Sequence, residues 1–203
     1  MHIEFLLEEP SCAEALKLLV PKIIGKQVSF ATRVFQGKTD FLNSLPARLR
    51  GYSRWLPRDW RIVVLVDCDR DDCRVLKAKL EKTALDAGLA TRTNPRRTGG
   101  LQVLNRIAVE ELEAWFFGDI EAIATSYPRI PRSLADKRGF RDPDAISGGT
   151  WEALERILKH AGYYAAGMPK IEVARFIGRH LLPNRNRSAS FKTFCRGLRE
   201  LVR

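Results

Sequence analysis

Long apolar runs are missing from this 203-residue sequence. No stretch approaches the roughly 20 apolar residues that a membrane-spanning helix needs, so we expect no membrane segment. The first residues include Glu4, Glu8 and Glu9 and lack the basic start and small-residue cleavage site of a signal peptide. We therefore expect a cytoplasmic protein.

Cysteine and histidine are also scarce, with four and three residues. The spacing of Cys68 and Cys73 does not match a zinc knuckle, and four cysteines in a chain of this length predict no disulfide framework, so we expect reduced thiols. The histidines form no metal-ligand pattern. The sequence contains no Ser-His-Asp or Cys-His arrangement and no Walker-type phosphate loop, so we expect no ATP hydrolysis by this chain.

Basic residues exceed acidic ones, with 35 Lys and Arg against 24 Asp and Glu, and the formal net charge is +11. Such a charge favours a polyanionic partner, most simply nucleic acid, or an acidic protein. We find no aromatic-basic recognition motif that would distinguish DNA, RNA and nucleotide.

Apolar periodicity predicts strands that alternate with helices. The expected strands are residues 3–7, 28–35, 62–66, 89–93 and 101–109. The expected helices are residues 11–20, 40–55, 73–87, 110–117, 151–161, 170–181 and 189–202. The helix that begins at residue 110 is expected to be extended, or to resume, through residue 124. Ser11 is the expected N-cap of the first helix, Pro21 is expected to follow its end, and Pro46 could kink the second.

This order predicts an α/β fold in which helices cover both faces of a mostly parallel sheet. Strands are expected only in the first part of the chain. We therefore predict an α/β domain over residues 1–127 and a helical extension over residues 128–203 that packs on it.

The stretch around residues 62–66 organises this prediction. Its unbroken apolar run suits a strand that is buried on both faces. Asp67, Asp69, Asp71 and Asp72 follow it directly, at the end of the sheet where open α/β sheets bind ligands. Clustered carboxylates repel one another unless protons or a cation compensate, and a hard divalent cation does so best. Alternatively, one of Asp71 and Asp72 only caps the next helix.

Acidic residues also follow two other expected strands. Glu8 follows the first strand, and Glu111 and Glu113 follow the strand that ends near Val109. Together these carboxylates could supply oxygen ligands for one or two Mg²⁺ or Mn²⁺ ions. Taken singly, Glu8 could be a solvated residue, and Glu111 and Glu113 a favourable acidic helix start.

The pattern of Glu8 after one strand and Asp67-x-Asp69 after another resembles the Toprim fold of topoisomerases, primases and OLD-type nucleases. The segments 8–11, 67–72, 111–119 and 188–191 resemble a prokaryotic Toprim-like family whose members are often encoded beside AAA-type ATPases, in settings suggestive of phage defence. One residue departs from the Toprim pattern, because Glu9 stands where Gly is common. Glu9 could disturb the turn, add a ligand or mark lost activity.

The resemblance implies roles for these carboxylates. Asp67 and Asp69 would hold Mg²⁺ or Mn²⁺, and Glu8 would be a ligand or the general acid/base, which makes these three the candidate catalytic residues. Further candidate ligands are Asp71, Glu111 and Glu113, the last of which would complete a second metal position. The candidate phosphate contacts are Arg96, Arg97, Arg106, Arg185, Arg187, Lys192 and Arg196, each of which could instead be a solvated surface charge.

Three hypotheses for the function follow. The first is a Mg²⁺-dependent nuclease or related phosphoryl-transfer enzyme that acts on DNA or RNA. The second is a non-catalytic subunit that binds nucleic acid or docks on an AAA-type ATPase. The third is a toxin-like effector whose substrate is RNA or a nucleotide. The oligomeric state stays open.

Overall fold

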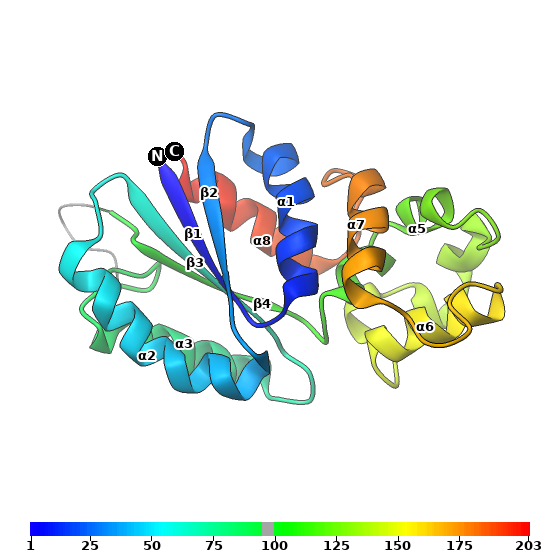
Figure 1. Cartoon of the computed structure of the whole chain (residues 1–203), viewed down its shortest axis with the longest axis horizontal. Coiled ribbons are helices and arrows are strands. Elements are labelled where there is room, and N and C mark those ends of the chain that lie inside the picture. The colour runs from blue at the N-terminus through cyan, green and yellow to red at the C-terminus, as the bar shows by residue number, and fades with distance from the viewer. Residues whose placement is uncertain (95–99) are drawn as a thin grey trace.

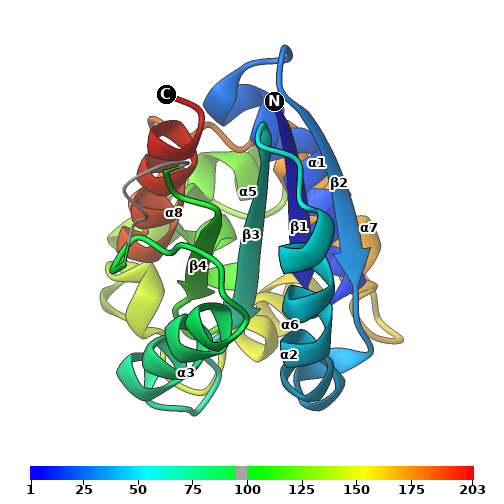
Figure 2. The same cartoon turned by 90° about the vertical axis from the view of Figure 1, so that its left-hand side faces the viewer.

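A four-stranded, all-parallel sheet forms the centre of the part of the chain that the computed structural model describes, residues 1–94 and 100–203 (Figures 1 and 2). Its order is β2-β1-β3-β4. The strands are β1 (His2–Leu7), β2 (Ser29–Val34), β3 (Trp60–Asp67) and β4 (Val103–Ala108). The predicted α/β class and parallel sheet are confirmed.

Strand β3 is interior, between β1 and β4, as its apolar run predicts. Ile62 and Val64 belong to the apolar core on one face of the sheet, and Val63 and Leu65 to the core on the other. Both faces of β3 are therefore removed from water, which is the environment that an unbroken β-branched run favours.

Helices cover both faces of the sheet (Figure 2). On one face lie α2 (Gly37–Trp55) and α3 (Cys73–Asp86). On the other lie α1 (Pro10–Ile24) and α8 (Ala189–Leu201), and α7 (Lys170–His180) packs against α1. Edge strand β2 is the least buried strand, since most of its side chains are exposed or half-buried.

The segment between β4 and α7 contains short helices and turns. These are α4 (Glu113–Phe117), α5 (Ile120–Ser126), three 3₁₀ turns (Arg132–Asp136, Arg138–Phe140 and Pro143–Ala145) and α6 (Thr150–His160). Their apolar residues continue the core of the α1 face, where the fully buried Trp115 packs against Phe191 and Phe194. None of the helices in the described ranges is long and apolar enough to span a membrane. The division at residue 127 stays a prediction.

Several local predictions are wrong. Helix α1 continues through Pro21 to Ile24, because burial of its last apolar residues stabilises the helix beyond the proline. Its N-cap is Glu9, and the hydroxyl of Ser11 donates to the Glu9 carboxylate. Residues 89–93 form one bridge to β4, since Thr91 and Asn94 close a turn on each other.

Of the two alternatives for the helix expected from residue 110, extension or resumption through residue 124, the structure shows resumption as a second helix. Helix α4 ends at Phe117, and Asp119 then caps α5 by accepting from the backbone N–H of Ala122. Pro46 lies inside α2, which continues without a break from Gly37 to Trp55.

Candidate metal site at the carboxyl ends of the strands

The ends of β1, β3 and β4 meet at one edge of the sheet. Glu8 directly follows β1, and its Oε2 accepts a hydrogen bond from the backbone N–H of Asp67, the last residue of β3, at 3.4 Å. The N–H of Asp69 donates to the carbonyl of Glu110, beyond β4, at 2.7 Å. Backbone contacts therefore bring the acidic segments after these strands together.

Four carboxyl groups interact at this edge, and we call them the carboxylate cluster: Glu8, Asp67, Asp69 and Glu113. Asp67 is central to it. Burial raises the pKa of Asp67 well above its ordinary value, and the charges of Glu113, Glu8 and Asp69 raise it further. Because each of these neighbours is acidic, the cluster carries more negative charge than its surroundings balance.

Glu8 and Glu113 show the same imbalance. Burial, followed by the charge of Asp69, raises the pKa of Glu8 to about 7. Burial raises the pKa of Glu113, which is 4% exposed, to about 7, although the positive charge of Lys170 opposes the shift. A divalent cation would favour the ionised forms of both groups and so relieve the repulsion.

Two lysines border the cluster. Lys38, at the start of α2, donates to the Asp69 carboxylate and the Cys68 carbonyl at 2.8 and 2.9 Å, and it also pairs with Asp71. Lys170, at the start of α7, lies 3.3 Å from the Glu9 carboxylate. The two ammonium groups neutralise the rim of the cluster.

The residue types of the cluster fit Mg²⁺ or Mn²⁺, since these ions prefer oxygen ligands. Within residues 1–94 and 100–203, however, no three acidic, histidine or cysteine side chains are gathered closely enough to hold a metal ion. In the structure the Asp69 carboxylate pairs with Lys38. Metal binding through Asp69 would therefore require Asp69 to leave Lys38.

Two predicted ligands have other partners. Glu111 accepts from the hydroxyl of Thr150 at 3.0 Å and the N–H of Trp151 at 2.7 Å, so it binds the start of α6. Asp71 is exposed and pairs with Lys38.

The capping role predicted for one of the two following acids belongs to Asp72. Its carboxylate accepts from the N–H groups of Arg74 and Val75 at the start of α3.

Two of the predicted phosphate contacts already have hydrogen-bond partners within the protein. Arg185 forms two hydrogen bonds, of 2.6 and 2.9 Å, to the buried carboxylate of Asp119. Arg106 is 6% exposed and donates to the carbonyls of Asn105 and Thr193. Both arginines hold the C-terminal segments in place.

The other described basic candidates are exposed. Lys192 and Arg196 lie on α8 and line a groove of about 460 Å³ together with Arg199 and Arg203. Arg187 is exposed in the loop before α8. Arg96 and Arg97 lie outside the described residues.

The expectation of four reduced thiols is wrong for two of them. Cys68 and Cys73 form a disulfide across the loop that contains Asp69 and Asp71, while Cys12 and Cys195 are free and buried. The backbone of Asp69 has a φ of 50°, in the left-handed region that few non-glycine residues adopt. The disulfide thus closes a short, acidic loop beside the cluster.

Both bordering lysines were missed by reasoning from sequence. The position of Lys38 could have been predicted from the sequence. Lys38 follows Gly37 just after an expected strand, and the acidic residues also lie just after expected strands. The position of Lys170 could not have been predicted, because α7 lies near the cluster only as a result of its packing against α1.

Comparisons with known proteins identify the family, and two solved structures are similar to this chain. A family model described as "Domain of unknown function (DUF4276)" matches residues 7–199. The C-terminal region of the Xanthomonas campestris pv. campestris OLD protein is similar with a TM-score of 0.47 and 16% identity, over 98% of this chain and 95% of that chain. The C-terminal region of the Burkholderia pseudomallei OLD protein has a TM-score of 0.49 and 16% identity, over 99% and 98%. A search of curated proteins gave no match.

Proposed function

Because this chain belongs to the family described as "Domain of unknown function (DUF4276)", we propose its function from the geometry of its own residues. The proposed function is that of a divalent-cation-dependent nuclease, or a related phosphoryl-transfer enzyme, on nucleic acid. The observation that carries the proposal is the carboxylate cluster, in which repulsion and burial raise the pKa values of Glu8, Asp67 and Glu113. Glu8 after β1 and Asp67-x-Asp69 after β3 also support a Toprim-like fold.

Asp67 and Glu8 would hold Mg²⁺ or Mn²⁺, with Asp69 and Glu113 as further carboxylates nearby. When bound, the ion would supply electrostatic stabilisation of the phosphoryl oxygens and an activated water. Without a bound cation, Glu8 and Glu113 have pKa values of about 7, so both can release a proton near neutral pH when the metal binds. Lys170 contributes positive charge beside Glu113, and the net charge of +11 favours a polyanionic substrate.

A metal titration tests the site. Calorimetry with Mg²⁺ and Mn²⁺ compares the wild type with Asp67→Asn, Asp69→Asn and the control Asp86→Asn, which alters an exposed acid on α3 that pairs with Lys82. Wild type and the control should bind the metal, and the first two variants should bind it at least tenfold more weakly. An equal metal response in wild type and Asp67→Asn would exclude the site.

A cleavage assay then tests the reaction. Labelled single-stranded and duplex DNA and RNA are incubated with each protein and either metal. Wild type and Asp86→Asn should cut at least one substrate, and Asp67→Asn should cut none. Metal binding without cleavage of any substrate would contradict the nuclease proposal.

A second candidate function has its own observation. Lys38 and Lys170 already pair with Asp69 and Glu9, as would suit a site that has exchanged its metal for ammonium groups. In that case the chain is a non-catalytic subunit that binds nucleic acid or docks on an AAA-type ATPase, in phage defence as the family resemblance implies. Absence of a metal response in the wild type, together with retained nucleic-acid binding, would favour this candidate.

A further inference from the structure

A pocket lined by charged and aromatic side chains lies away from the carboxylate cluster, between α2 and the first strands. It encloses about 780 Å³. Trp60, on its wall, is the first residue of β3, whereas Asp67 of the cluster is the last. The eight residues of β3 span roughly 26 Å, so the Trp60 side of the pocket and the cluster lie near opposite ends of the sheet. We call it the Trp55 pocket; its lining includes Glu4, Arg33, Arg48, Tyr52, Trp55 and Trp60.

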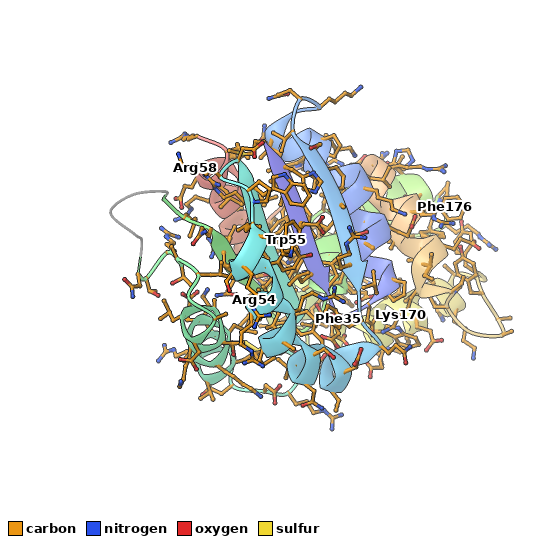
Figure 3. All side chains as sticks on the ribbon, turned by 60° about the vertical axis from the view of Figure 1, so that its left-hand side comes forward. Phe35, Arg54, Trp55, Arg58, Lys170 and Phe176 are labelled. Atoms are coloured by element: carbon orange, nitrogen blue, oxygen red, sulfur yellow. A yellow bond between two sulfur atoms is a disulfide. The ribbon has the colours of Figure 1, made fainter. Side chains whose placement is uncertain are left out.

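Trp55 is the main apolar surface of this pocket. It is 56% exposed, which is unusual for so large a side chain. Its ring lies 5.3 Å from the ring of Tyr52 and 5.7 Å from that of Trp60, measured between centroids. These contacts hold the indole in position while much of its surface stays in water. In Figure 3, Trp55 lies where α2 meets the strands.

Arg33 is held at the pocket by a buried carboxylate. Glu4 is 2% exposed and accepts from Arg33 Nε at 3.1 Å and Nη2 at 3.4 Å. His2 and Tyr52 also bond to the Glu4 carboxylate, which fixes its orientation. The Arg33 side chain remains 54% exposed. A guanidinium that is fixed on one side and open on the other is arranged to meet an anion or a flat ring without further loss of side-chain entropy.

The chain around Trp55 is strongly basic. Residues 48–61 contain five arginines and one acidic residue, interleaved with Tyr52, Trp55 and Trp60. This segment did not stand out in the sequence as an aromatic-basic motif, because it crosses from a helix into a strand. The arginines are Arg48, Arg50, Arg54, Arg58 and Arg61.

We propose that the Trp55 pocket binds an unpaired base of a single-stranded nucleic acid. Stacking of a base on an exposed aromatic ring stabilises such complexes by about 1–3 kcal/mol per base. Arg33 and Arg48 supply positive charge for the flanking phosphates. A base inside a duplex is already stacked on its neighbours, so the pocket selects single strands. This contact region lies outside the cluster, and its role does not depend on metal binding or cleavage.

Binding of a labelled 12-nucleotide single strand tests the proposal, measured by fluorescence anisotropy in EDTA so that cleavage plays no part. Trp55→Leu should raise the Kd about tenfold, and Trp55→Phe should raise it less because a ring remains. The matched control is Phe176→Leu, another exposed aromatic beside an arginine, Arg179, on α7. This control should change the Kd less than twofold. Figure 3 shows Phe176 well apart from Trp55.

Two further variants make the binding test specific to this pocket. Arg33→Gln should also weaken binding, which keeps the test valid if Trp55→Leu does not fold. Asp86→Asn, on α3 outside the cluster and this pocket, should bind the single strand like the wild type. Because EDTA removes any metal, a failed nuclease proposal leaves this result unchanged. Equal affinity of Trp55→Leu and wild type, or absent single-strand binding by the wild type, would overturn the proposal. A wild-type dimer that Trp55→Leu dissociates would overturn it too, by making the pocket an interface between copies.

Discussion

At the scale of single residues, Asp67 shows most clearly the tension between stability and chemistry. Burial raises the pKa of its carboxyl group, and four acidic neighbours, Glu113, Glu8, Asp69 and Glu9, raise it further. Such a group destabilises the folded state whenever it is ionised without a compensating cation. The presence of a carboxylate rather than an amide at this position is explained if the carboxylate has a function, such as metal binding, that an amide could not perform.

Asp67→Asn should therefore leave the metal-free protein as stable as the wild type or more stable. The amide keeps the shape of the side chain and removes the buried charge. Thermal unfolding in EDTA measures this, with Val64→Ala as the contrasting variant. Val64 is fully buried, so its truncation should lower the free energy of unfolding by about 1–3 kcal/mol. A large loss of stability in Asp67→Asn would show that the carboxylate is structural.

Glu81, on α3, is a buried acid of the opposite kind. Burial alone would raise its pKa, but hydrogen bonds from Lys77 and Asn105 outweigh burial and lower the pKa to about 2, below its ordinary value of 4.5. The hydroxyl of Thr93 also donates to it, at 2.8 Å. Unlike the cluster, this carboxylate has donors on several sides.

This network predicts a specific acid sensitivity. A lowered pKa means that Glu81 stabilises the folded state above about pH 4.5 and loses that contribution as the pH falls towards 2. Glu81→Gln should lower the free energy of unfolding at pH 7 by about 1–3 kcal/mol and by much less at pH 2. Urea unfolding at the two pH values measures the difference. An equal loss at both would show that the ionised form is not what the network stabilises.

At the scale of elements, the loop between β3 and α3 is the most constrained turn at the candidate site. The Cys68–Cys73 disulfide closes it, Asp72 caps α3, and Lys38 holds Asp69. Three independent interactions thus fix the backbone that carries the Asp-x-Asp pair. A loop held in this way can present carboxylates without the entropic cost of ordering them on each binding event.

Cys73→Ser should reduce the free energy of unfolding by roughly 2 kcal/mol, since a short closed loop restricts the unfolded chain only moderately. Urea unfolding without reductant measures this change. Addition of a dithiol reductant to the wild type should reproduce it, and the same reductant should not affect Cys73→Ser. A wild type that is indifferent to the reductant would contradict the stabilising role of the bridge.

Elements were predictable from sequence where local pattern and tertiary environment agree. The apolar run of residues 62–66 could only suit an interior strand, and β3 contains it. Prediction failed where packing overrides local preference, as at Pro21, which α1 accommodates because the residues beyond it are buried. Residues 89–93 look like a strand but form only a bridge, because their backbone closes a turn.

The candidate site was likewise predictable only in part. The proximity of Glu8 and Asp67 was predictable because each directly follows an expected strand, and parallel strands bring such positions together. The partner of Glu111 could not be found, because the start of α6 lies about 40 residues later in the chain and reaches Glu111 only in the folded protein. The disulfide was missed for a different reason. The number of cysteines was used to infer whether the thiols are reduced, and it gives no information on the distance between two side chains.

At the scale of the whole molecule, two groups of exposed basic residues lie apart from the carboxylate cluster, which Lys38 and Lys170 border. Exposed basic residues gather in residues 48–61 and on α8, while the acidic groups meet at the carboxyl ends of the strands. A polyanion attracted by the net charge of +11 would therefore bind first to these basic residues. It would approach the carboxylate cluster only if a cation shields the negative charge of the cluster.

Nucleic-acid binding should weaken steeply with salt, because displaced counterions drive it. We expect the affinity for single strands to fall at least tenfold between 50 and 200 mM salt, roughly as several phosphate contacts require. The double variant with Lys192→Gln and Arg196→Gln should reduce the slope of log K against log salt by about 1–2 if α8 contacts phosphates. Affinity that is independent of salt would favour an acidic protein partner instead.

The disulfide beside Asp69 also has a practical consequence for anyone who prepares this protein. Purification buffers often contain a thiol reductant, and cleavage assays are frequently run in the same buffer. Two samples with one sequence can then differ in the covalent structure of the segment that carries Asp69 and Asp71. A non-reducing gel with a thiol label would distinguish them, and each activity measurement refers to one of the two forms.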